Sequence, residues 1–360
     1  MIIMKDITIL ISASGSPTIP GLIDCFKKNG ERSIRIVGID MIDEPSINFL
    51  VDKFYKVPPV TDPDYIDIVL DICKKESIDI YFPNISYEVT IVSRRKLDFY
   101  DIGTIISTPN NQSANIANNK LLLYEFLQSS GIDVPKFYGV NSIKDFEDGC
   151  NYIGYPDVAV CIKIVDGSGS RGVRIIDSKR NRYQIFVNEK PNSFFISYSD
   201  MKNILSESKD KFHEMLLVEY LPGNEYTVDL LADSGTVRYI AGRENIISLM
   251  SIAQECIVRR DDLAYKICED IVKNLNLDGN IGFDFMRDKN GKAVLMDLNP
   301  RITATVSVIA AAGLNLPYLR IKQLLGEELP DVNVKYGTRL KRRYSEIYTD
   351  ANGNLINIGL

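Results

Sequence analysis

The chain has 360 residues, of which 45% are hydrophobic and 25% charged, and its formal net charge is −6. These values are typical of globular proteins, and the length allows two or three domains that each bury a core. The acidic balance argues against binding of polyanions as the main function, so nucleic acid is not an expected partner. The sequence contains no apolar run of about 18 residues, so we expect a cytoplasmic protein with no membrane partner.

Six cysteines are scattered without a C-x-x-C pair, and His213 is the single histidine. This pattern predicts neither a disulfide framework nor a zinc site, and we expect the cysteines to be buried as small apolar residues. His213 stands in a charged segment, which predicts a position on the surface. A chain with one histidine could also barely build a Ser/His/Asp or Cys/His nucleophilic site.

The first ~115 residues alternate predicted strands with predicted helices. The strands are expected over 7–13, 33–39 and 78–82, and the helices over 19–28 and 65–76. Short βα units of this kind predict a parallel sheet covered by helices. The first turn lacks G-x-G-x-x-G, so a dinucleotide site is not favoured. We expect a packing domain that lends a loop to a substrate pocket.

A new domain is predicted to begin near Asn119-Lys120 with a helix that stops at Gly131. A strand over 158–165 then carries Lys163 and leads into a loop rich in small residues, namely Gly167, Ser168, Gly169, Ser170, Arg171 and Gly172. Backbone N–H groups of such a loop can fold over phosphate oxygens, and the neighbouring cations add positive charge. The alternative is an ordinary flexible turn.

Residues 183–213 are polar and poorly periodic, which predicts an irregular part of a lid. Two strands are expected over 215–233, joined at Pro222-Gly223. The backbone of Glu219, Tyr220 and Leu221 can meet an adenine edge, and Glu225 can accept from ribose hydroxyls; the alternative is an edge strand with ordinary acids. Helices are predicted over 261–274 and 302–313, and two short strands over 340–360. Loops after Ser12, around 243–251 and after Arg301 are expected to set substrate specificity.

Residues 279–301 predict a β-hairpin around Asn290-Gly291. A two-residue turn would place Asp284 opposite Asp297 and Gly282 opposite Asn299. Like charges in opposed positions destabilise a sheet, which is tolerated most readily when a divalent cation lies between them. Two carboxylates and an amide are hard oxygen ligands that suit Mg²⁺. A three-residue loop with a bulge would shift the pairing by one residue and separate the acids, and a solvated outer face is the other alternative.

The order of these parts resembles the ATP-grasp enzymes, and the N-terminal part looks like the domain that precedes them in the carbamoyl-phosphate-synthase-like branch. The resemblance implies an α/β and α+β fold, with a Rossmann-like pre-ATP-grasp domain followed by a two-lobed ATP-grasp fold. The implied boundaries are 1–115 for the N-terminal domain, 116–217 for the lid, 218–335 for the C-terminal subdomain and 336–360 for a β tail.

The resemblance also implies roles for single residues. Lys120 and Lys163 would contact the ATP phosphates, Glu219 and Leu221 the adenine, and Glu225 the ribose. Asp284, Asp297 and Asn299 would hold Mg²⁺, with Mn²⁺ as an alternative ion, and Arg301 would contact phosphate or the reacting carboxylate. The sequence departs from the family pattern at Asp297, where glutamate is usual, and at Asn119, where aspartate is usual. The shorter acid disfavours two-metal binding.

We therefore expect an ATP-dependent ligase that joins a small-molecule carboxylate to an amine, or to a thiol, through an acyl phosphate. Positioning and charge neutralisation would supply most of its catalysis. One alternative is a non-catalytic nucleotide-binding subunit, and another is a phosphotransferase that stops at the acyl phosphate. The identity of the substrates is open, and a homodimer is a fair expectation.

Overall fold

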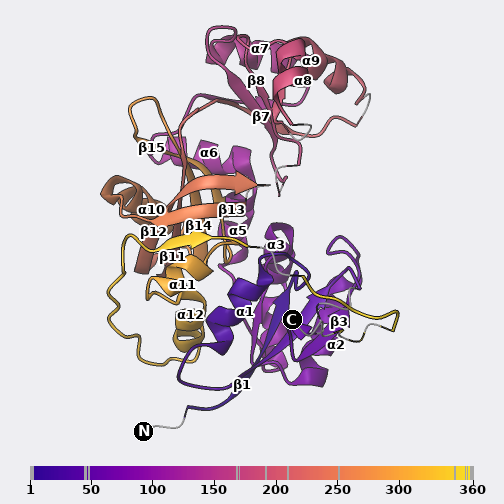
Figure 1. Ribbon diagram of the computed structural model, residues 1–360, viewed down its shortest axis with the longest axis vertical. Helices are drawn as coiled ribbons and strands as arrows, with labels where there is room; N and C mark the ends of the chain where they lie inside the picture. Colours follow the sequence, from indigo (N-terminus) through magenta and orange to yellow (C-terminus); the bar gives the residue numbers. More distant parts are fainter. Residues whose placement is uncertain are drawn as a thin grey trace. The chain divides into compact units, whose positions relative to one another are not determined.

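The computed structural model describes residues 4–43, 47, 49–167, 169, 171–190, 193–208, 211–249, 252–343, 346–352, 354 and 356. The chain forms two compact units (Figure 1). The first comprises Met1–Asn115, Tyr226–Asp284 and Leu298–Leu360, and the second comprises Ile116–Glu225 and Phe285–Asp297. The four-part division expected from the sequence stays a prediction.

A five-stranded parallel sheet of order β3-β2-β1-β4-β5 forms the N-terminal part of the first unit. Its strands are β1 (Ile7–Ser12), β2 (Ile34–Asp40), β3 (Lys53–Lys56), β4 (Ile80–Phe82) and β5 (Ile105–Ile106). The accompanying helices are α1 (Ile19–Lys27), α2 (Tyr65–Glu76), α3 (Ser86–Arg94), α4 (Lys96–Asp101) and α5 (Asn111–Asn118). Ile9 and Ile11 pack in the cluster that includes α1, whereas Leu10 packs in the one that includes α2. The predicted parallel sheet with helices on both faces is therefore confirmed.

A second sheet has six strands in the order β15-β14-β11-β12-β13-β16. The strands are β11 (Glu225–Asp233), β12 (Thr236–Leu249), β13 (Ile252–Val258), β14 (Gly279–Arg287), β15 (Ala293–Asn299) and β16 (Arg339–Lys341), and the helices are α10 (Asp262–Asn274), α11 (Ser307–Ala311) and α12 (Leu316–Leu324). Leu231 and Ala241 of this sheet share one core with Leu319 of α12 and Phe26 of α1. Two expectations were wrong. Residues 243–249 belong to β12 rather than to a loop, and the helix expected over 302–313 is found only as the shorter α11.

The second unit contains a five-stranded sheet of order β6-β10-β7-β8-β9. Its strands are β6 (Phe137–Val140), β7 (Val160–Ile164), β8 (Arg174–Ile176), β9 (Phe195–Ile196) and β10 (Met215–Glu219), and its helices are α6 (Lys120–Ser129), α7 (Ile143–Ile153), α8 (Arg182–Asn188) and α9 (Tyr198–Ser206). One face packs on α7 and α9, and the other packs on α6. The prediction of irregular structure over 183–213 was wrong, because α8 and α9 lie there. The side chains of Asn181 and Ser197 cap the beginnings of these two helices.

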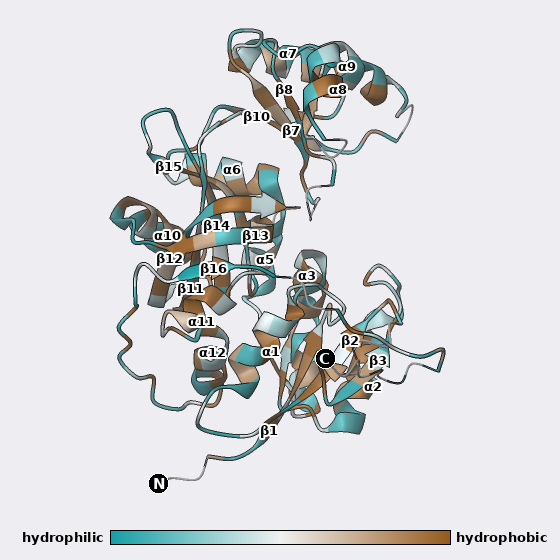
Figure 2. Cartoon of the chain, in the orientation of Figure 1, coloured by the Kyte–Doolittle hydropathy of each residue, from teal (hydrophilic) through white to brown (hydrophobic). Residues whose placement is uncertain are grey.

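Apolar residues gather on the central strands of the sheets: Figure 2 colours β1 mainly brown, whereas the edge strand β16 is teal. All six cysteines are buried and free, and burial raises the pKa of the Cys25 thiol to about 12. A thiol with such a pKa is a poor nucleophile, so the expected structural role of the cysteines is confirmed. His213 is exposed, as predicted. Within the described ranges, no helix is long and apolar enough to cross a membrane.

A buried carboxyl group ties together the ends of two central strands of the N-terminal sheet. Glu88 of α3 is fully buried and accepts hydrogen bonds from the hydroxyls of Ser12, Tyr65 and Tyr81. It also accepts from the backbone N–H of Asn84, at 3.1 Å. Ser12 ends β1 and Asn84 follows β4, so this carboxyl group fixes the two loops beyond those strands.

Burial raises the pKa of the Glu88 carboxyl above its usual value. The stability that this group contributes is therefore fully present below the pKa of the unfolded chain and is lost as the pH rises through the folded pKa. Replacing Glu88 with glutamine, which cannot ionise, removes this dependence. We expect the unfolding free energy of the wild type, relative to Glu88→Gln, to fall between pH 5 and pH 8 in urea denaturation. A difference that stays constant over this range would contradict the assignment.

Candidate functional site

The turn of the β14–β15 hairpin differs from the predicted two-residue turn. The backbone N–H of Asp288 donates to Lys292 O at 2.9 Å, and the N–H of Gly291 donates to Asp288 O at 3.0 Å. Gly291 has a φ of +80°. This is a three-residue loop closed by a glycine bulge, and the Asp288 carboxylate stabilises it by accepting from the N–H groups of Asn290 and Lys292. At this end of the hairpin Asp288 faces Lys292, one residue away from the predicted pairing.

At the other end of the hairpin, Gly282 and Asn299 lie close together, as they would in the predicted pairing. A Cβ built on Gly282 would lie 3.8 Å from the Asn299 Cβ, so the two residues lie next to each other across the hairpin. From Gly282 to Asp288 the chain advances six residues, whereas from Lys292 to Asn299 it advances seven. β15 therefore holds one extra residue between these points, as in a β-bulge. If the pairing set by the turn continued along the hairpin, Asp284 and Asp297 would be one residue out of register.

In the first unit, Asp284 lies at the centre of a chain of polar contacts. Its Oδ1 accepts from the Thr227 hydroxyl at 2.9 Å, and its Oδ2 accepts from the Asn299 amide at 3.0 Å. The Asn299 Oδ1 in turn accepts from the Arg301 guanidinium at 3.3 Å. The structure thus brings together three residues that the sequence singled out for metal and phosphate contacts, namely Asp284, Asn299 and Arg301.

Arg301 follows β15, and its guanidinium donates hydrogen bonds to several groups of the first unit. Its Nε donates to the Ser86 hydroxyl at 3.3 Å, and its Nη1 donates to Ile302 O at 2.9 Å. Ser86 is the first residue of α3, which accompanies the N-terminal sheet, and it lies in the same unit as Arg301. A guanidinium stays charged at any relevant pH, so this position offers a fixed positive charge to an anion.

Several polar residues beside Asp284 were missed in the sequence. Thr227 and Asp229 of β11 face Arg243 and Asn245 of β12: the Asn245 amide donates to the Thr227 hydroxyl at 3.1 Å, and Arg243 pairs with the buried Asp229. Thr303 also donates to Asp229, at 2.6 Å. The polar residues at every second position of EYTVD and of REN were the signal that could have found them.

The residues around Asp284 fit a hard divalent cation. Asp284, Asn299 and Thr227 present carboxylate, amide and hydroxyl oxygens, which are the donors that Mg²⁺ prefers. In the described part of the chain, the buried Asn245 Oδ1 receives no hydrogen bond. No group of three or more His, Cys, Asp or Glu side chains suited to a metal occurs among the residues described. A metal at these residues would therefore rest on one carboxylate, an amide, a hydroxyl and water, and Mg²⁺ in proteins usually keeps several waters.

In the second unit, Lys120 lies between the Gly/Ser loop and Asp297. Its Nζ donates to Gly167 O at 2.8 Å and lies 3.6 Å from Asp297 Oδ2, and the side chain is only 10% exposed. One turn further along α6, the Tyr124 hydroxyl lies 3.3 Å from Met296 O of β15. α6 is thus anchored to β15, which holds the Lys120 ammonium next to the carboxylate. Lys120 and Asp297, which the sequence singled out for phosphate and metal contacts, are therefore in contact with each other.

Lys163 lies on β7, on the same face as Cys161 and α6. Cys161 packs in the cluster that contains Tyr124, and side chains two residues apart on a strand share a face. The loop after β7 turns back through Gly169 and Gly172, which have φ values of +63° and +69°. A Cβ at Gly172 would lie 2.4 Å from the Ile164 side chain, so only glycine fits there. The predicted contacts of Ser168 and Ser170 lie outside the described residues.

The predicted adenine contacts lie at the end of β10. This strand lies between β6 and β7, so Glu219 is not on an edge strand. The N–H groups of Glu219 and Tyr220 donate to Lys136 O and Ala159 O, both at 2.9 Å. These bonds use two of the predicted donors and leave the N–H of the buried Leu221 as the candidate for adenine. Glu225, predicted to meet the ribose, begins β11.

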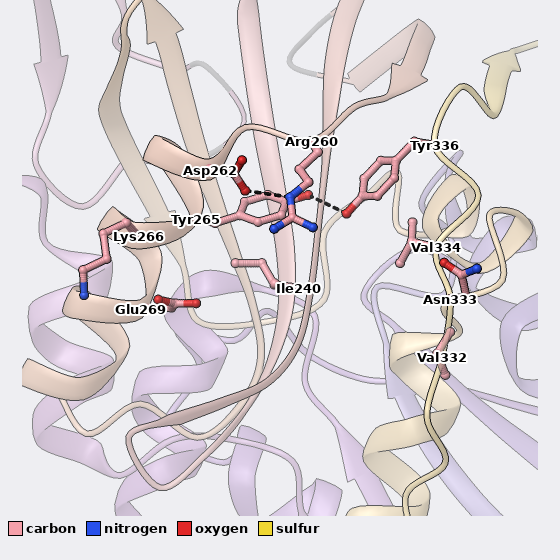
Figure 3. A pocket seen from close by; sticks show the side chains of 10 residues that line it. All are labelled: Ile240, Arg260, Asp262, Tyr265, Lys266, Glu269, Val332, Asn333, Val334 and Tyr336. Carbon is pink, nitrogen blue, oxygen red and sulfur yellow. Dashed lines mark hydrogen bonds and ion pairs between the residues drawn. The ribbon is translucent and has the colours of Figure 1, made fainter.

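A cavity of about 480 Å³ is lined by other residues of the first unit (Figure 3). It is lined by side chains of α10 and of the segment after α12, among them Tyr265 and Tyr336. Its cations are paired: Arg260 Nε lies 2.6 Å from Asp262, and Lys266 Nζ lies 2.9 Å from Asp270. None of the residues predicted for the site lines this cavity, so the cavity is not the predicted nucleotide and metal site.

Two family models match the chain. Residues 211–345 match a family described as ATP-grasp in the biosynthetic pathway with Ter operon. Residues 9–107 match the PylC-like N-terminal domain. The first range contains Asp284, Asp297, Asn299 and Arg301, whereas Lys120 and Lys163 lie outside both ranges. These matches confirm the resemblance drawn from the sequence.

The chain is also homologous to the carbamoyl phosphate synthase large chain. It is 22% identical to the protein of Pseudothermotoga lettingae over 301 residues, which are 79% of this chain and 24% of the relative. The chain therefore spans about a quarter of the length of the curated relative that it matches.

Solved structures share the fold at low identity. N5-carboxyaminoimidazole synthetase from Staphylococcus aureus, complexed with ADP, has a TM-score of 0.68 and 15% identity, over 92% of this chain and 81% of that chain. L-amino acid ligase from Bacillus licheniformis has a TM-score of 0.63 and 16% identity, over 89% and 74%. These similarities confirm the predicted fold class.

Proposed function

Because the chain combines a PylC-like N-terminal domain with an ATP-grasp domain, we propose that it is an ATP-dependent ligase acting on a small-molecule carboxylate and an amine. The observation that carries the proposal is the contact chain from Asp284 through Asn299 to Arg301. It sets oxygen ligands for a cation beside a fixed positive charge, which is the arrangement that phosphoryl transfer to a carboxylate needs.

The nucleotide is proposed to bind through residues of the second unit. Lys120 and Lys163 contact the phosphates, with the N–H groups of the loop from Gly167 to Gly172, including Ser168, Gly169 and Ser170. Leu221 meets the adenine, flanked by Glu219 and Tyr220, and Glu225 accepts from the ribose. Support for Lys120 comes from its contact with Gly167 O, because an ammonium held at that loop is ready for an anion.

Asp284 and Asn299, together with Asp297, are proposed to hold Mg²⁺, with Mn²⁺ as the alternative ion. When bound, the ion neutralises charge on the phosphates. Thr227 orients the Asp284 carboxylate by its hydrogen bond, and Lys120 keeps Asp297 close to the phosphate loop. Asp297 reaches less far than the usual glutamate, so one shared cation is the simpler assignment.

The reaction is proposed to run in two steps. A carboxylate oxygen of the substrate attacks the γ-phosphorus, the bond to the bridging oxygen of ADP breaks, and an acyl phosphate forms. The amine then attacks the acyl carbon and releases phosphate, which carries away one oxygen of the original carboxylate. Arg301 holds the reacting carboxylate and stabilises its developing charge. A thiol in place of the amine would give a thioester by the same steps.

An ADP-release assay across pairs of amino acids and related acids tests this function. We expect release only when an acid and an amine are present together. Release with an acid alone, trapped by hydroxylamine as a hydroxamate, would identify a phosphotransferase that stops at the acyl phosphate. No release with any pair, while ATP still binds, would leave the non-catalytic nucleotide-binding subunit as the better assignment.

The assembly and the location of the protein are also proposals. We propose a homodimer in the cytoplasm, where ATP is available. Light scattering behind a sizing column decides the first, since a mass of 40.6 kDa would mean a monomer.

A further inference from the structure

Three neighbouring strands of the six-stranded sheet carry a row of polar side chains. In the order β14-β11-β12, Asp284 lies on the first strand, Thr227 on the second and Asn245 on the third, all in the first unit. Thr227 is 1% exposed and Asn245 is 7% exposed, whereas Asp284 is only partly buried. The row thus leads from two buried positions to the carboxylate that is proposed to hold Mg²⁺.

The hydrogen bonds of this row have a fixed direction. The Asn245 Nδ2 donates to the Thr227 hydroxyl at 3.1 Å, and this hydroxyl donates to Asp284 Oδ1 at 2.9 Å. An ionised carboxylate only accepts, so the single hydroxyl proton of Thr227 goes to Asp284. The hydroxyl oxygen is then left to accept, and the amide of Asn245 turns its NH₂ group toward it. Asn245 therefore fixes the hydroxyl that holds the Asp284 carboxylate.

The amide of Asn245 is unfavourable for the stability of the sheet. Its Oδ1 is buried, and no residue within the described ranges donates to it. An apolar side chain of the same shape would avoid this loss. β12 also bulges directly after this residue, since Asn245 pairs with Cys256 and Ile247 with Glu255, which leaves Ile246 as the extra residue. An unfavourable side chain beside a bulge is typical of a functional position.

We propose that Asn245 is a positioning residue of the metal site, which acts through Thr227 to hold the Asp284 carboxylate in the orientation that binds a divalent cation. The proposal rests on the proposed function and assigns to its metal site a residue that provides no ligand itself. Metal ligands depend on such outer hydrogen bonds for their orientation.

Binding of Mn²⁺ in the presence of saturating ADP tests this role without turnover. Unbound Mn²⁺ is counted by EPR, and the melting temperature is measured without metal. Asn245→Leu keeps the shape of the side chain and should weaken Mn²⁺ binding roughly 10- to 100-fold. Its melting temperature should stay unchanged or rise, because the buried Oδ1 without a donor is gone from the described structure. A merely structural residue would instead lower the melting temperature and leave the affinity unchanged.

Asn280→Leu is the matched control. Asn280 lies on β14 of the same sheet, is also 7% exposed, and likewise has a buried Oδ1 to which no described residue donates. Its Nδ2 donates to Leu316 O at 3.1 Å rather than to the row of Asp284. Its replacement should therefore leave the affinity for Mn²⁺ unchanged.

A double-mutant cycle tests whether Asn245 acts through Thr227. Thr227→Val removes the hydroxyl and should weaken Mn²⁺ binding at least as much as Asn245→Leu, whereas Thr227→Ser keeps the hydroxyl and should keep the affinity. Adding Asn245→Leu to Thr227→Val should cause no further loss, because the group that the amide holds is already missing.

An unchanged Mn²⁺ affinity in Asn245→Leu, an equal loss in Asn280→Leu, losses that add in the double variant, or no Mn²⁺ bound by the wild type would overturn the proposal. If the affinity depends on Asn245 but no pair of substrates supports ADP release, the ligase function fails and the positioning role stands. If ADP is released while the affinity does not depend on Asn245, the positioning role fails alone.

Discussion

Replacing Asp284 with asparagine is expected to lower ATP turnover by on the order of a thousandfold, because a catalytic metal ion contributes several kcal/mol of transition-state stabilisation. Asparagine keeps the shape of the side chain and the oxygen that accepts from Thr227. It loses the charge that would hold Mg²⁺ and turns an amide group toward the Asn299 amide. Steady-state ADP release and thermal melts of both proteins measure the two effects separately.

The stability change in this variant should be small, about 1 kcal/mol, since one hydrogen bond to Asn299 is disturbed. Stabilisation by Mg²⁺ with ATP should shrink with the loss of affinity. Asp262→Asn is the matched control, because Asp262 pairs with Arg260 at the cavity of Figure 3 and lies outside the proposed site. Full turnover in Asp284→Asn, or an equal loss in Asp262→Asn, would remove the metal site from this position.

Replacing Lys120 with methionine is expected to weaken binding of ATP with Mg²⁺ by roughly 10- to 100-fold, because a charge-assisted hydrogen bond contributes about 1.5–3 kcal/mol. Methionine keeps an apolar stem of similar length, so the packing of α6 should survive. Without nucleotide, the variant also loses the ion pair with Asp297. Calorimetric titration with ATP, with and without Mg²⁺, measures the affinity.

Lys144→Met is the control for this variant. Lys144 lies in the same unit, is 82% exposed and pairs with Asp148 on the surface, so its loss should leave the affinity for ATP unchanged. An unchanged affinity in Lys120→Met would exclude this lysine from the phosphate site and leave it a structural role beside Asp297.

The Lys120 contact also changes the expectation for Asp297. Opposed carboxylates would predict that Asp297→Asn relieves repulsion and melts at the same or a higher temperature. Because the Lys120 ammonium lies 3.6 Å from the Asp297 carboxylate, removal of the charge loses an attraction instead. The sequence could not predict this pair, since the two residues are separated by about half of the chain and meet only when α6 packs on β15.

The local sequence predicted the β14–β15 hairpin correctly but not the length of its turn. Asn-Gly between two apolar runs predicted the hairpin, but the same dipeptide suits both a two-residue turn and a three-residue loop that ends in glycine. The carboxylate of Asp288 decides between them by accepting from two N–H groups of the loop. This side-chain contact moved the pairing at the turn by one residue.

The helices α8 and α9 were not predicted, because their sequence is polar. Residues 183–213 were expected to be irregular, yet α9 begins after Ser197, whose side chain accepts from the N–H of Asp200. The spacing of Ser197 and Asp200 is that of a helix cap, so the local signal was present. By contrast, α2 was predicted over 65–76 and is found there, because its apolar residues recur on one face.

The transfer of a carboxylate oxygen to phosphate tests the central claim most directly. The acid that supports the most ADP release is prepared with ¹⁸O in its carboxylate and turned over with ATP, Mg²⁺ and the amine, and the released phosphate is analysed by ³¹P NMR. An acyl phosphate predicts one ¹⁸O atom in each phosphate released from fully labelled acid. Phosphate without label, formed while ADP accumulates, would show that water attacked ATP and would contradict the ligase mechanism.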